Sequence, residues 1–155
     1  MSTPSTPSAC VVPPSGGKVI RAFGDEITVH LGGGETGGKY TMFTDVTPPG
    51  GGPPPHRHLN EDEWFYVLEG RAEFFKDGVW TEAPVGTAAF MPRGVVHSFR
   101  NPGDKPLRML VPRRTPRSLS LGLGVSSRLV KPHLDQNASG QYHVQDERNQ
   151  LHRRS

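Results

Sequence analysis

The sequence predicts an all-β fold. Short segments rich in aromatic and β-branched residues follow one another, turn residues separate them, and no helical apolar period is present. The chain of 155 residues contains 19 glycines and 16 prolines, while its apolar share is only 33%. That composition favours turns over long helices, and the length suits one domain.

The predicted strands are short and occupy the middle of the chain. They are expected at residues 18–23, 26–31, 39–46, 63–69, 71–75, 79–82, 86–91, 97–100 and 107–111. The Asp77-Gly78 step is a strong hairpin signal between two of them. A glycine-rich loop is expected at residues 32–38. Five prolines in residues 48–55 exclude a central strand, because proline donates no ladder hydrogen bond, and predict a stiff loop.

The clearest strand, residues 63–69, alternates between two faces. One face carries Glu63, Phe65 and Val67, and the other carries Trp64, Tyr66 and Leu68. If the glutamate lies inside the fold, the second set points outward and needs cover from another sheet or a second subunit. We therefore expect a homodimer.

Three histidines and a carboxylate indicate a metal site. His56 and His58 are two residues apart, so on an extended segment both point to the same face. His97 follows a Pro-Arg-Gly turn in a separate segment. Imidazole and carboxylate together suit one divalent ion, with Fe, Mn or Ni favoured and Zn, Co or Cu also accepted.

The carboxylate ligand has three candidates in the sequence. Glu63 is preferred, because it directly precedes the apolar strand, while Glu61 and Asp62 are the alternatives. The predicted metal ligands are therefore His56, His58, Glu63 and His97.

The spacing of these residues resembles the two sequence motifs of the cupin superfamily. The first motif is filled by Gly50, His56, His58, Glu63 and Gly70, and the second by Gly86, Pro92, Gly94, His97 and Asn101. The intervening residues 71–85 are similar in length to the spacers of small bacterial single-domain cupins of the cupin-2 type. The resemblance implies a jelly-roll β-barrel.

The composition divides the chain into three parts. A disordered segment is expected at residues 1–17, the barrel at 18–112 and a basic, flexible tail at 113–155. The tail carries eight Lys/Arg and three Asp/Glu, but these charges are scattered, so nucleic acid is not the expected partner. Neither a membrane-spanning run nor a signal peptide is found. Cys10 is the only cysteine, which favours a cytoplasmic location.

The resemblance is compatible with more than one class of function. A quercetin-dioxygenase-like cupin would be a metal-dependent oxidoreductase acting on a small phenolic or diketone-like substrate, with Glu63 as general base. Phe65, Val67 and Met91 are the candidate pocket residues. The alternatives are a non-catalytic module that binds a sugar or another small molecule, and an isomerase or epimerase. Whether the protein is an enzyme is left undecided.

Overall fold

The computed structural model describes residues 7–114, 134–136 and 142–144. Residues 7–17 contain no strand and are mostly exposed. The rest of the expected disordered N-terminal segment, and all but two short strands of residues 115–155, lie outside the described residues.

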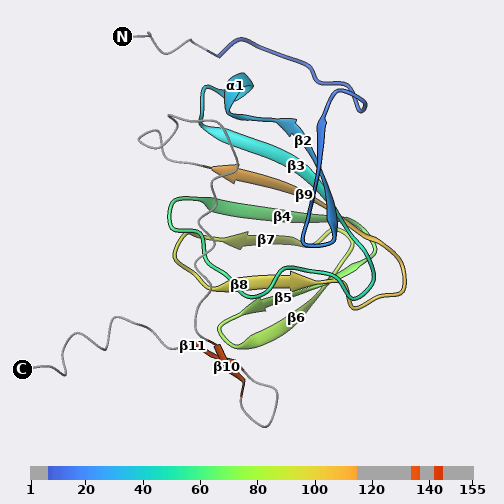
Figure 1. Ribbon diagram of the computed structural model, residues 1–155, viewed down its shortest axis with the longest axis vertical. Coiled ribbons are helices and arrows are strands. Elements are labelled where there is room, and N and C mark those ends of the chain that lie inside the picture. The colour runs from blue at the N-terminus through green and yellow to red at the C-terminus, as the bar shows by residue number, and fades with distance from the viewer. Residues whose placement is uncertain (1–6, 115–133, 137–141, 145–155) are drawn as a thin grey trace, which may run out of the picture.

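The described residues form β-strands and one single-turn helix (Figure 1). These elements are β1 (Lys18–Ala22), β2 (Asp25–Leu31), α1 (Gly33–Thr36), β3 (Tyr40–Thr47), β4 (Asp62–Glu69), β5 (Arg71–Lys76), β6 (Val79–Pro84), β7 (Ala88–Met91), β8 (His97–Arg100), β9 (Leu107–Arg114), β10 (Leu134–Gln136) and β11 (Tyr142–Val144). A six-stranded sheet has the order β1-β2-β3-β9-β4-β7, a three-stranded sheet the order β6-β5-β8, and β10 pairs with β11. The predicted all-β class is confirmed.

The two larger sheets pack against each other through one apolar core. Phe65 of the six-stranded sheet lies 5.1 Å from Phe74 and 5.7 Å from Phe99 of the three-stranded sheet, measured between ring centroids. All three side chains are buried in the same cluster. This packed double sheet is the jelly-roll arrangement that the resemblance to the cupin motifs implies.

The alternation predicted for residues 63–69 is confirmed. Glu63, Phe65 and Val67 are buried, whereas the neighbouring Trp64 and Tyr66 retain 36% and 45% exposure. The glutamate therefore points into the barrel and the two aromatic side chains point out of it.

The strand expected at residues 107–111 is longer in the structure. β9 continues to Arg114 and pairs with β3 along its whole length, including Met42 opposite Pro112. Pairing with β4 is interrupted around Pro112, which has no N–H to donate, and is restored by Glu63 opposite Arg113. The proline thus weakens one ladder without ending the strand.

The glycine-rich loop expected at residues 32–38 contains the single-turn helix α1. The Glu35 carboxylate accepts a hydrogen bond of 2.8 Å from the backbone N–H of Gly32. Gly37 then ends the turn in the left-handed conformation, with φ of 61°. A local side-chain contact makes this turn helical, although its residue types favour a loop.

Candidate metal centre

Backbone hydrogen bonds place two of the histidines opposite each other. The N–H of His56 donates to the carbonyl of His97 at 2.9 Å, and the N–H of His97 donates back at 2.8 Å. Gly94, in the turn before β8, donates to the carbonyl of His58 at 2.7 Å. The segment after the proline-rich loop is thereby held against β8 like an added strand.

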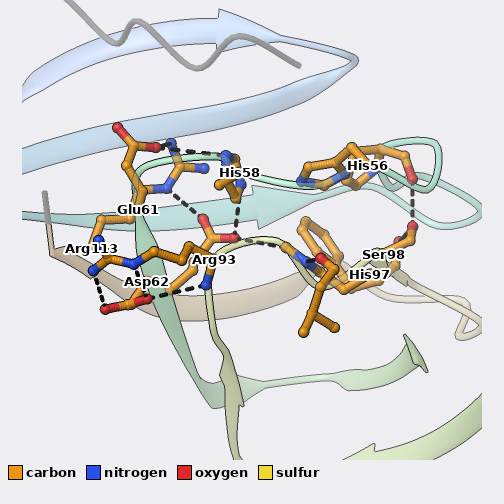
Figure 2. Close-up of polar contacts among 12 residues, drawn as sticks. His56, His58, Glu61, Asp62, Arg93, His97, Ser98 and Arg113 are labelled. Atoms are coloured by element: carbon orange, nitrogen blue, oxygen red, sulfur yellow. Dashed lines mark hydrogen bonds and ion pairs between the residues drawn. The ribbon is translucent and has the colours of Figure 1, made fainter. Parts of the chain in front are cut away.

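The proline-rich loop is itself fixed to the end of β8. Gly50 donates to the carbonyl of Asn101 at 2.9 Å, and the N–H of Asn101 donates to Gly51 at 3.0 Å. The Ser98 hydroxyl donates to the carbonyl of Pro53 at 2.6 Å (Figure 2). These bonds provide partners for backbone groups of a loop that forms no sheet ladder, and they set the position of His56.

The structure brings together the four residues that the sequence singles out as ligands. His56, His58, Glu63 and His97 are all buried, and the ligand atoms they offer lie within 4.8 Å of one another. Glu63 Oε2 is 3.1 Å from His97 Nε2 and 3.3 Å from His58 Nε2. Such a buried group of three imidazoles and one carboxylate could hold a metal ion.

The ring nitrogens that point away from this group have acceptors nearby. His56 Nδ1 lies 2.9 Å from the carbonyl oxygen of Pro54, and His97 Nδ1 lies 3.0 Å from that of Val95. Hydrogen bonds from these Nδ1–H groups leave the Nε2 atoms of both rings as electron-pair donors.

His58 provides a separate test of whether an ion fits. Both of its ring nitrogens are buried and make no hydrogen bond within the described residues. Nδ1 lies 3.6 Å from Glu61 Oε2, which is beyond hydrogen-bonding distance. A buried nitrogen that makes no hydrogen bond is costly. An ion bound at Nε2 would relieve that cost, so the donor set fits a metal.

The protonation states also suit ligation. Burial raises the pKa of Glu63, but the charge of Arg113 and the contacts from His58 and His97 outweigh it and hold the pKa well below its usual range. Burial, and then the charge of His97, lower the pKa of His56 to about 4. At neutral pH the carboxylate is therefore ionised and His56 is neutral, as metal ligands must be.

Arg113 is a site residue that the sequence reasoning missed. Its Nε donates to Glu63 Oε1 at 2.5 Å, and a terminal nitrogen lies 3.7 Å from Glu61 Oε2. We expected this arginine in the basic tail, because the apolar pattern fails after Pro112. Its position could have been found by extending the alternation of Leu107, Met109 and Val111, which are all buried, by one more step.

The alternative carboxylates lie beside the cluster, not within it. Glu61 contacts His58 and Arg113, as described above. Asp62 pairs with Arg93 instead, whose hydrogen bonds lower the pKa of Asp62 to about 2 (Figure 2).

The three candidate pocket residues, Phe65, Val67 and Met91, are all buried in the core. The Phe65 ring lies 6.4 Å from that of His97, and Met91 is in register with Glu63.

The central part of the chain matches the sequence model of a known family. Residues 43–112 match the Cupin_2 family model, described as the cupin domain. An uncharacterized protein of Aquifex aeolicus is 38% identical over 50 residues, which are 32% of this chain and 41% of that protein. One of Methanocaldococcus jannaschii is 30% identical over 74 residues, 48% of this chain and 59% of its own length. The chain thus spans about half the length of these two relatives.

Several solved structures share the fold. A predicted oxalate decarboxylase of Thermotoga maritima has a TM-score of 0.64 at 24% identity, covering 69% of this chain and all of its own. The polyketide cyclase RemF of Streptomyces resistomycificus has a TM-score of 0.58 at 24% identity, covering 77% and 90%. KdgF of Halomonas sp. has a TM-score of 0.60 at 14% identity, covering 70% and 97%. At such identities the likeness shows the fold alone.

Proposed function

We propose that this chain, whose residues 43–112 form a cupin domain, binds one divalent metal ion and uses it to bind a small organic molecule. The metal ligands are His56, His58, Glu63 and His97. One observation supports this most strongly, namely that all four are buried with their ligand atoms within 4.8 Å of one another. The carboxylate in the set favours Fe, Mn or Ni, and Zn, Co or Cu also suit it.

The protein ligands would leave coordination positions for an exogenous molecule. Open positions distinguish catalytic and ligand-binding metals from closed structural sites. When bound, the ion would supply Lewis-acid chemistry and, if redox-active, electron transfer. The first candidate activity is a dioxygenase acting on a phenolic or diketone-like substrate.

Glu63 has a ligand role and a candidate catalytic role. The pKa of its carboxyl group is held well below the usual range. A weakly basic carboxylate is a poor proton acceptor near neutral pH, so the ligand role is better supported than general-base catalysis. The same observation favours the second candidate, a non-catalytic module that binds a small molecule or sugar. An isomerase or epimerase would also need a stronger base than this carboxylate.

The exposed aromatic face of the six-stranded sheet supports a homodimer. Trp64 of β4 and Phe90 of β7 lie 4.9 Å apart between ring centroids, and Phe90 is 49% exposed. Tyr66 and Leu68 extend this outer face along β4. A second copy covering it would bury all four side chains.

No helix in the described residues is long and apolar enough to cross a membrane. The cytoplasm is the proposed location.

The proposal is tested on protein purified without chelator or affinity nickel. We expect stoichiometric native metal, and its loss in the His56→Ala/His97→Ala double variant. His30→Ala is the matched control, because His30 is partly buried but bonds to Thr44 outside the cluster. Metal retained by the double variant would contradict the site. Oxygen uptake with flavonols, diketones and catechols then distinguishes the candidate activities. If the native metal is zinc and no oxygen is consumed, the dioxygenase is excluded and the binding module remains.

A further inference from the structure

We propose that Arg113 makes the site selective for anionic small molecules, such as carboxylates, enolates or phenolates, over neutral ones such as sugars. The inference rests on the proposed metal binding and names the ligand class of the same site. It starts from a charged side chain that lies beside the proposed metal ligands and is not a ligand itself.

Arg113 occupies the last inward position of β9 before the strand ends. It is in register with Glu63 on β4 and with Thr41 on β3. Its guanidinium lies 5.2 Å from the centroid of the Phe43 ring, which supports it from one side. The Arg113 side chain is 16% exposed, whereas that of Glu63 is 2% exposed. The guanidinium is therefore closer to solvent than the carboxylate that it contacts.

The Arg113 guanidinium is hydrogen-bonded to one carboxylate, faces a second and keeps further donors. Nε donates to Glu63 Oε1, and a terminal nitrogen faces Glu61 at 3.7 Å, too long for a hydrogen bond. Figure 2 shows Glu61, His58 and Arg113 gathered on the side of the cluster away from His56 and Ser98. Within the described residues, Nε makes the only hydrogen bond of this side chain. Its terminal N–H groups thus remain for a molecule entering beside Glu61.

The contact with Arg113 gives the two Glu63 oxygens different roles. Oε1 accepts from Arg113, while Oε2 faces His58 and His97 at 3.3 and 3.1 Å. Oε2 is then the oxygen available to an ion. A glutamate held in this way would offer an ion one oxygen, whereas a bidentate carboxylate would offer two.

A charge count gives the preference for anions. A divalent ion with neutral histidines brings two positive charges, Glu61 and Glu63 remove both, and Arg113 restores one. Asp62 is already neutralised by Arg93. Asp45 of β3 is buried, and burial raises its pKa to about 7, so it adds only a partial negative charge near neutral pH. With Arg113 the site attracts an anion, and without Arg113 it is close to neutral.

The test compares an anionic with a neutral ligand on the cobalt(II)-loaded protein. Azide and imidazole are titrated separately and followed by the visible cobalt spectrum. In Arg113→Met we expect azide affinity to fall roughly ten- to a hundredfold at low ionic strength, which is the effect of removing one nearby unit charge from a partly buried site. Imidazole affinity should stay unchanged, and Arg113→Lys should keep most of the azide affinity.

Arg108→Met is the matched control, because Arg108 also lies on β9 but pairs with the exposed Glu69, at the opposite end of β4 from Glu63. Unchanged azide affinity in cobalt-loaded Arg113→Met, or an equal loss of azide and imidazole affinity, would overturn the inference. If Arg113→Met does not fold, the wild-type protein provides the test. Raising the concentration of a non-coordinating salt should weaken azide binding but not imidazole binding. Equal effects on both would overturn the inference. A wild type that binds no cobalt would instead overturn the proposed metal site.

Discussion

Asp62 and Arg93 are joined by two parallel hydrogen bonds, from Nε to Oδ1 at 2.9 Å and from a terminal nitrogen to Oδ2 at 2.6 Å. The backbone N–H of Arg93 also donates to Oδ1, at 3.1 Å. Asp62 begins β4 directly before Glu63, and Arg93 lies in the turn whose Gly94 bonds to His58. This pair therefore fixes the relative positions of two proposed ligands that come from different segments.

We expect Asp62→Ala to weaken metal binding more than it lowers the melting temperature of the metal-free protein. The pair is partly exposed, so its own contribution to stability is small, while its effect on ligand positions is direct. Metal affinity by competitive titration and melting by circular dichroism provide the comparison. Glu82→Ala, which removes an exposed acid from a long contact with Arg71, should change neither. Wild-type metal affinity in Asp62→Ala would contradict the positioning role.

Two buried carboxyl groups predict that stability falls as pH rises. Burial raises the pKa of Asp25 to about 6, and burial together with the charge of Asp25 raises that of Asp45 to about 7. Since the folded state binds these protons more tightly than the unfolded chain, their contribution is full below about pH 4 and is lost as pH rises to about 7. The loss should amount to several kcal/mol, since each pKa unit of difference corresponds to roughly 1.4 kcal/mol.

Asp45→Asn should flatten this pH dependence. Its amide oxygen can still accept from the Thr47 hydroxyl, which bonds to Asp45 at 3.2 Å. Urea unfolding at pH 5 and pH 8 measures the free energy of unfolding of both proteins. We expect the variant to be the more stable protein at the higher pH, and an unchanged slope with pH would show that Asp45 does not titrate in this range.

Gly52 lies where a side chain cannot fit. Its φ is 138°, and an added Cβ would overlap the carbonyl oxygen of Phe99 in β8. Gly86 also has a positive φ, of 88°, but a Cβ there would meet nothing within 4 Å. We expect Gly86→Ala to cost about 1–2 kcal/mol from backbone strain alone. Gly52→Ala should cost more, and equal losses in urea unfolding would show that the close approach is unimportant.

The proposed dimer can be tested by placing charge on the aromatic face. Trp64→Glu together with Tyr66→Glu should convert a dimer into a folded monomer in sedimentation experiments, because like charges would meet where apolar side chains pack. Val79→Glu changes an exposed apolar residue of β6 in the other sheet and should leave the dimer intact. A wild-type monomer at tens of micromolar would contradict the dimer itself.

Local residue patterns predicted those parts of the candidate site that depend on residues close together in the sequence. Alternation along residues 63–69 correctly placed Glu63 inside and Trp64 outside, and turn residues located most strand ends. Arg113 was missed because the composition changes after Pro112. The pairing with β3 that carries the strand past that proline is a long-range contact, which local patterns do not show. The pairing of Asp62 with Arg93 was equally hidden, since no local pattern brings these two residues together.

The reciprocal hydrogen bonds between His56 and His97 bear on when the proposed metal ion would bind during folding. They join segments that are far apart in the chain, and contacts of this kind form late, after slow non-local pairing. The three histidines then converge only in the closed barrel, so an ion cannot act as an early template. We expect the refolding rate to be the same with and without metal, and the unfolding rate to carry the full effect of the ion. The identity of the bound metal would then be decided by which ion is available to the finished fold.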